Sequence, residues 1–137
     1  MSFLKQNYRV LIVDDAEINR SMLTDMLSGE YEVMEAADGQ EAVALLEKRH
    51  TEISLVLLDI IMPQMSGFEV LAFMNKSAWL QSVPVIMISS DTSSASVDQA
   101  YDLGATDYIS RPFDEKTVRR RVKNTFVLYY ISTVLFS

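Results

Sequence analysis

Cysteine is absent from this chain of 137 residues, which also has only one histidine, four glycines and three prolines. Without cysteine the protein has no disulfide framework, no thiolate zinc site and no cysteine nucleophile. This composition fits a reducing compartment. The first seven residues are too polar and too short for the apolar stretch of a signal peptide, so secretion is not expected and the cytoplasm is the expected location.

Positive charge is scarce as well: 12 lysines and arginines stand against 19 aspartates and glutamates, which leaves a net charge of −7. A surface of this sign repels phosphate backbones, so direct binding to nucleic acid is not expected. Long apolar runs are also missing. The most apolar segment, 126–136, is shorter than the roughly 18–20 residues of a membrane span, so no membrane association is expected.

The sequence does contain the material for one packed globular domain, because 49% of its residues are hydrophobic. Short apolar runs alternate with segments of helical period. The predicted strands are Tyr8–Val13, Tyr31–Ala36, Ile53–Leu58, Pro84–Ile88 and Asp107–Ser110. The predicted helices are Ala16–Ser28, Gln40–Arg49, Gly67–Asn75, Ser93–Leu103 and one that opens near Asp114. Strands that are almost wholly apolar are buried on both faces, so the pattern predicts a doubly wound α/β fold, with a five-stranded parallel sheet between two layers of helices.

Carboxylates, a hydroxyl and a guanidinium follow the predicted strands at their carboxyl ends, where ligands bind in sheets of this kind. Asp14 and Asp15 follow the first strand, Asp59 the third, Ser89 the fourth, and Arg111 the fifth. Carboxylates that lie close together repel one another unless a cation neutralises them, and oxygen ligands suit Mg²⁺. The sequence therefore predicts a divalent-cation site. The alternative is that the acidic residues are solvated turn formers and helix caps.

Asp59 is the best candidate for a chemically active carboxylate. It follows the apolar run Ile53–Leu58, which would hold it rigidly, and it precedes a loop with turn residues, 60–67. An aspartate can attack phosphorus to give an aspartyl phosphate when cations neutralise the oxygens of the transferring group. Taken alone, a Leu-Leu-Asp strand end indicates little.

The motifs together resemble the receiver domain of two-component response regulators. The resemblance runs in order from about Tyr8 to Lys123, and we divide the chain into a receiver domain, 1–125, and a C-terminal extension, 126–137. The residues that carry it are Asp14-Asp15, Leu57-Leu58-Asp59 with 60–67, Pro84–Ser90, Gly104–Ser110 and Arg111-Pro112-Phe113. The resemblance implies the flavodoxin-like strand order 2-1-3-4-5.

The resemblance also implies roles for the strand-end residues. Asp59 would accept a phosphoryl group from a sensor histidine kinase or a phosphotransfer protein. Mg²⁺ would be held by Asp14, Asp15 and Asp59 with the backbone carbonyl of Ile61. The protein would then be a signalling switch rather than an enzyme.

Two further positions match the part of this family that responds to phosphorylation. Ser89 would bond a phosphoryl oxygen, and Tyr108 would swing inward behind it. A downstream effector protein, or an output domain absent from this sequence, would read the changed surface. The plainer alternative for Tyr108 is an amphipathic core residue whose hydroxyl lies in water.

Arg111 departs from the family pattern, which has lysine before this proline. Arginine keeps the charge but is longer, planar and forked. It could clamp a phosphoryl group with two hydrogen bonds, or it could point outward and leave a constitutive interaction module that no longer switches. A second alternative function is a Mg²⁺-dependent phosphohydrolase with an aspartyl nucleophile. Such enzymes usually have a second acid beside the nucleophile, whereas Ile60 and Ile61 follow Asp59 here.

Amphipathic stripes predict how the first and last helices pack. In the first helix, Ile18, Met22 and Met26 form one stripe with Leu23 and Leu27 beside it, and we expect this face on the core. In the last helix, one stripe continues beyond the usual receiver end. Its residues are Val118, Val122, Phe126, Tyr129 and Thr133. We expect this helix to extend through 126–137 and to bury the stripe against a second copy, as a homodimer, or against an output domain. The alternative for 126–136 is a strand.

Overall fold

The computed structural model describes the backbone of residues 7–136 and the side chains of residues 7–129. Its strands are β1 (Arg9–Val13), β2 (Glu32–Ala36), β3 (Leu55–Asp59), β4 (Val85–Ser89) and β5 (Asp107–Ser110). Its α-helices are α1 (Glu17–Leu27), α2 (Gly39–Arg49), α3 (Gly67–Lys76), α4 (Ser94–Asp102) and α5 (Glu115–Phe136). Two short 3₁₀ turns, η2 (His50–Glu52) and η3 (Trp79–Gln81), precede β3 and β4.

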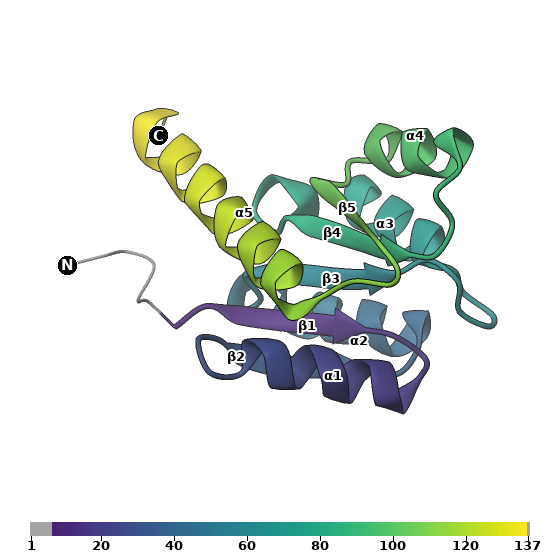
Figure 1. The fold of residues 1–137 in the computed structure, drawn as a ribbon. Coiled ribbons are helices and arrows are strands. Elements are labelled where there is room, and N and C mark those ends of the chain that lie inside the picture. The colour runs from purple at the N-terminus through teal and green to yellow at the C-terminus, as the bar shows by residue number, and fades with distance from the viewer. Residues whose placement is uncertain (1–6, 137) are drawn as a thin grey trace.

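The strands form one parallel sheet in the order β2-β1-β3-β4-β5. Helices α1 and α5 cover one face, and α2, α3 and α4 cover the other (Figure 1). The doubly wound fold and its predicted strand order are confirmed. The predicted strands and helices differ from the observed ones by at most two residues at each described boundary, most visibly at β3, which begins at Leu55 instead of Ile53 and includes Asp59.

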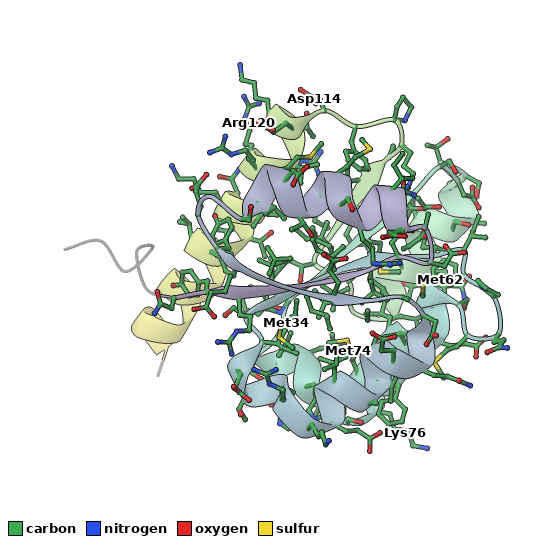
Figure 2. The ribbon with its side chains drawn as sticks, turned by 90° about the horizontal axis from the view of Figure 1, so that it is seen from below. Met34, Met62, Met74, Lys76, Asp114 and Arg120 are labelled. Carbon is green, nitrogen blue, oxygen red and sulfur yellow. The ribbon has the colours of Figure 1, made fainter. Side chains whose placement is uncertain are left out.

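Each strand supplies alternate side chains to the two faces of the sheet. Val10 and Ile12 pack with the core under α1 and α5, whereas Leu11 and Val13 pack with the core under α2, α3 and α4. The inner strands β1, β3 and β4 are almost wholly apolar because both of their faces are covered, whereas the edge strand β2 carries Glu32 and Glu35. Figure 2 shows Met34 and Met74 among the side chains between the sheet and its helices. Met74 belongs to the second of these cores, and Met34 packs against it.

Helix α1 corrects the predicted packing of its apolar stripe. Leu23 and Leu27 are buried, and Met26 packs partly against them. Ile18 and Met22, however, are 71% and 45% exposed. The expectation that both face the core is wrong, because the buried stripe of α1 runs through Leu23 and Leu27 and turns the neighbouring stripe toward solvent. Met22 instead lines a surface hollow beside the strand ends.

Helix α5 is long, and the segment 126–136 is helical rather than a strand. Val118, Val122 and Phe126 are buried in the core of this same chain. The prediction that these residues bury against another chain is therefore wrong. Phe126 stacks on Tyr8 with ring centroids 4.4 Å apart. Thr133 lies outside the residues whose side chains are described.

No helix in the described part of the chain combines the length and the apolar character that a bilayer crossing requires.

Candidate functional site

Three carboxylates converge at the carboxyl edge of the sheet. Asp14 and Asp15 follow β1, and Asp59 ends the neighbouring strand β3, where Val13 pairs with Leu58. Carboxylate oxygens of the three aspartates all lie within 4.8 Å of one another. Asp14 is buried, Asp59 is nearly so and Asp15 is exposed. A set of hard oxygen donors that is open to solvent on one side fits a divalent cation that keeps part of its water shell.

Asp14 is fixed by hydrogen bonds from two segments of the chain, residues 16–20 at the start of α1 and Arg111 after β5. Its Oδ1 accepts a 2.9 Å bond from the Ala16 N–H and a 3.4 Å bond from Asn19 Nδ2. Its Oδ2 accepts a 2.6 Å bond from Arg111 Nη2. Its backbone carbonyl accepts a 2.8 Å bond from Arg20 Nη1. Sequence reasoning missed Asn19 and Arg20, although a helix that begins directly after the acidic pair turns its first residues back toward that pair.

Asp59 has a markedly perturbed acidity. Burial of the side chain, followed by the negative charge of Asp14, raises the pKa of Asp59 from 3.8 to about 6. The guanidinium of Arg111 and a backbone hydrogen bond with Ile61 act in the opposite direction. At neutral pH the carboxylate is mostly ionised, as a nucleophile must be, and a cation among the three carboxylates would favour the ionised form further.

The loop after Asp59 packs tightly against the end of β3. The N–H of Gly67 donates a 2.8 Å bond to the carbonyl of Ile60. A Cβ at position 67 would overlap the carbonyl oxygen of Asp59 and lie 2.8 Å from the Cα of Ile60. Glycine at 67 therefore allows α3 to begin directly beside the candidate nucleophile. Ile61, two residues after Asp59, is 67% exposed.

Ser89 and Tyr108 both contact the backbone of Asp91. The hydroxyl oxygen of Ser89 accepts a 3.1 Å bond from the Asp91 N–H, and the hydroxyl of Tyr108 donates a 2.5 Å bond to the Asp91 carbonyl. Both side chains are buried. The carboxylate of Asp91 accepts bonds from the Ser93 N–H (2.9 Å) and the Ser96 hydroxyl (2.5 Å), so Asp91 joins β4, β5 and the start of α4.

Arg111 points into the cluster of carboxylates and not outward. Its Nη2 lies 2.6 Å from Asp14 Oδ2 and 3.8 Å from Asp59 Oδ1. Its backbone N–H donates a 2.9 Å bond to the carbonyl of Ser89, and its guanidinium lies 5.7 Å from the centroid of the Phe113 ring. The structure thus places the three aspartates, Ser89 and Arg111 at the ends of four neighbouring strands, and the hydroxyl of Tyr108, from within β5, reaches Asp91 after β4.

A mostly apolar hollow of about 350 Å³ opens beside this edge. It is lined by Asn19, Met22, Ser90, Arg111, Pro112 and Phe113.

Comparison with known proteins shows the family of this chain. The family model of the response regulator receiver domain matches residues 10–123. The chain belongs to the response regulator receiver domain family. The predicted resemblance is confirmed. Receiver domains are mostly signalling switches.

Relatives of this receiver domain include proteins of very different length. Response regulator RR06 of Streptococcus pneumoniae is 36% identical over 89% of this chain and 54% of its own length. Protein PilH of Pseudomonas aeruginosa is 32% identical over 83% of this chain and 93% of its own length. The chain spans about half of the length of several curated relatives, for example 48% of the probable transcriptional regulator ycf27 of Porphyridium aerugineum.

Solved structures agree with the receiver fold. Chemotaxis protein CheY4 of Vibrio cholerae has a TM-score of 0.80 and 30% identity, over 86% of this chain and 98% of its own. The CheY in the CheX–CheY–BeF₃–Mg²⁺ complex of Borrelia burgdorferi has a TM-score of 0.80 and 34% identity, over 87% of this chain and 89% of its own.

Proposed function

We propose that this receiver domain is a phosphoacceptor switch in which Asp59 accepts a phosphoryl group from a sensor histidine kinase or a phosphotransfer protein. Mg²⁺ would be held by Asp14, Asp15, Asp59 and the backbone carbonyl of Ile61. The observation that carries the proposal is the convergence of three carboxylates within 4.8 Å, with Asp59 at the end of a buried strand. The Mg²⁺ and the phosphoryl analogue in the Borrelia CheY complex support it by analogy.

The proposed transfer needs little from the protein beyond position and charge. A carboxylate oxygen of Asp59 forms a bond to phosphorus as the bond between phosphorus and the donor's imidazole nitrogen breaks, and the bonding electron pair leaves with the imidazole. When bound, Mg²⁺ would neutralise charge on the phosphoryl oxygens. Strand β3 holds Asp59 in place, and Arg111 supplies a second positive charge 3.8 Å away.

The proposed response begins at Ser89. The phosphoryl group adds roughly 1.5–2 negative charges and new acceptor oxygens. The hydroxyl of Ser89, which now accepts a bond from Asp91, would rotate to donate to a phosphoryl oxygen instead. That loosens one of the two bonds that tie the Asp91 backbone to β4 and β5, and Tyr108 holds the other. The segment from Ser89 to α4 would thereby present a changed surface to an effector protein or output domain.

Treatment of the full chain with acetyl phosphate and Mg²⁺, followed by intact-mass spectrometry, tests this proposal. We expect the mass of one phosphoryl group to be added to the native chain and none to Asp59→Asn. Asp91→Asn is the matched control, because it changes an aspartate close by in the fold that is not the proposed acceptor. Equal modification of the native chain and Asp59→Asn would overturn the assignment of Asp59.

A second function is supported by Arg111. Its guanidinium pairs more closely with Asp14 than with Asp59, which would suit a constitutive interaction module that has lost switching. Modification of Arg111→Lys under conditions in which the native chain stays unmodified would favour this module. Sustained turnover of a phosphate ester would instead favour a phosphohydrolase. The division at residue 125, cytoplasmic location and a homodimer through the last helix remain predictions.

A further inference from the structure

We infer that Arg111 is an internal counter-cation of Asp14, and that binding of Mg²⁺ requires its guanidinium to leave the Asp14 carboxylate. The inference rests on the proposed function, because it concerns the same carboxylates. It goes beyond that function in assigning Arg111 a role before any phosphoryl group arrives. Arg111 is thus a positioning residue that sets how tightly the metal binds.

The first observation is that both oxygens of the Asp14 carboxylate already accept hydrogen bonds. Oδ1 accepts from Ala16 and Asn19, and Oδ2 accepts a 2.6 Å bond from Arg111. The side chain of Asp14 is only 1% exposed. A carboxylate buried to this extent is costly without a positive partner, and the guanidinium of Arg111 is such a partner.

The second observation is where the guanidinium lies. Nη2 of Arg111 is positioned between Asp14 Oδ2, at 2.6 Å, and Asp59 Oδ1, at 3.8 Å. It therefore occupies part of the space in which the three carboxylates converge. A dication that uses the same oxygen of Asp14 would meet the guanidinium at short range in a partly buried site, where repulsion between like charges is weakly screened.

The third observation is that the guanidinium of Arg111 has a second position available to it, away from Asp14. Its backbone is fixed by the bond to the Ser89 carbonyl, but its guanidinium already lies near Asp59 and next to the hollow lined by Met22 and Phe113. Released from Asp14, the planar fork of the guanidinium can turn toward Asp59, where phosphoryl oxygens would be bound. On metal binding, the guanidinium of Arg111 would thus exchange its ion pair with Asp14 for one with Asp59.

The competition has a reciprocal consequence. If Mg²⁺ weakens the Arg111–Asp14 pair, this pair must weaken Mg²⁺ binding by the same factor. Removal of the guanidinium should therefore raise Mg²⁺ affinity and make the metal-free domain less stable. The size of the change should be about tenfold in the dissociation constant, which is the worth of one charge-assisted hydrogen bond.

The test is calorimetric titration of the full chain with magnesium chloride alone, without any phosphodonor. We expect Arg111→Gln to bind Mg²⁺ about tenfold more tightly than the native chain. Arg20→Gln is the matched control, since it also removes a positive charge near Asp14 but leaves the carboxylate pair with Arg111 intact. We expect no gain in Mg²⁺ affinity from it. Equal gains from both variants, or none from Arg111→Gln, would overturn the inference.

A second readout uses the native chain and so does not depend on how a variant folds. The side-chain Nε–H signal of Arg111, assigned by its loss in Arg111→Gln, should shift on titration with Mg²⁺ at the same midpoint as metal binding. A signal that stays in place while Mg²⁺ binds would overturn the inference.

The outcomes separate this inference from the proposed function. If the native chain binds Mg²⁺ and Asp59 takes up a phosphoryl group while Arg111→Gln has native affinity, only the inference fails. If Arg111→Gln tightens Mg²⁺ binding but Asp59 is never modified, only the phosphoacceptor role fails. If no variant binds Mg²⁺, both the inference and the proposed metal site fail.

Discussion

The hydroxyl of Tyr108 donates a 2.5 Å hydrogen bond to the backbone carbonyl of Asp91, seventeen residues earlier in the chain. Asp91 also donates its backbone N–H to the hydroxyl of Ser89, and its carboxylate accepts two hydrogen bonds from the start of α4. One residue therefore connects the proposed phosphoryl-binding hydroxyl, the buried aromatic side chain and the helix that would present the altered surface.

Tyr108→Phe tests this connection. The substitution removes the bond to the Asp91 carbonyl but keeps the buried ring, so we expect a loss of about 0.5–1.5 kcal/mol in the free energy of unfolding. Tyr101→Phe, at a tyrosine that is 45% exposed, is the control and should change stability by less than about 0.5 kcal/mol. Urea unfolding measures both variants. Equal stability of Tyr108→Phe and the native chain would contradict the importance of this bond.

Ionisation of Asp59 should make stability depend on pH. Its pKa in the folded domain, about 6, lies above the ordinary value of 3.8 because burial disfavours the carboxylate. A raised carboxyl pKa destabilises the folded state only where the group is ionised. The cost is therefore absent below about pH 4, grows as pH rises, and is complete above about pH 6.

Asp59→Asn should remove this cost. In EDTA at about pH 7.5 we expect the variant to be more stable than the native chain by about 1–2 kcal/mol, after allowance for partial screening by solvent. The difference should vanish near pH 4, and urea unfolding across this range measures it. A stability difference that is the same at both ends of the range would contradict the raised pKa.

Gly67 should tolerate no side chain. A Cβ there would overlap the carbonyl oxygen of Asp59, so Gly67→Ala forces the backbone of the loop to move. We expect a loss of about 1–3 kcal/mol in the free energy of unfolding and slower modification by acetyl phosphate, since Asp59 shifts with the loop. Gly29→Ala is the control, because a Cβ at position 29 meets nothing within 4 Å. Similar stability of the two variants would contradict the tight packing at Gly67.

Phe126 should anchor α5 to its own domain. The side chain is 4% exposed, stacks on Tyr8 and packs against Tyr31. We expect Phe126→Ala to cost about 3 kcal/mol or more. Leu128→Ala, two residues further on and 64% exposed, should change stability by less than about 0.5 kcal/mol in the monomer. Thermal unfolding at two protein concentrations distinguishes this intrachain role from one in a dimer, where the loss at Phe126 would depend on concentration.

The sheet was predictable because burial on both faces leaves strands with a signature that little else in a soluble chain shares. Val10–Val13, Leu55–Leu58 and Val85–Ile88 are apolar without alternation, and each precedes a polar loop. The strand-end carboxylates were predictable for the same reason. Once the strands are parallel, their carboxyl ends meet at one edge whatever the distance between them in the sequence.

Side-chain direction was not predictable to the same degree. The stripe of Ile18, Met22 and Met26 has correct helical spacing, but periodicity does not say which of two adjacent stripes faces the sheet. In the last helix, Val118, Val122 and Phe126 have the spacing of an interface, and only the path of α5 across the sheet shows that the interface lies within the chain. The guanidinium of Arg111 lies closer to the carboxylate of Asp14 than to that of Asp59. The difference is of the order of an ångström, and no spacing in the sequence encodes it.

The most direct test of the central claim is a crystal structure of the domain grown with magnesium chloride and beryllofluoride. The account predicts a beryllofluoride group bonded to a carboxylate oxygen of Asp59, Mg²⁺ held beside it by Asp14, Asp15, Asp59 and the carbonyl of Ile61, and the Ser89 hydroxyl turned toward the adduct. Crystals grown with both additives that contain neither the adduct nor the metal at Asp59 would contradict it.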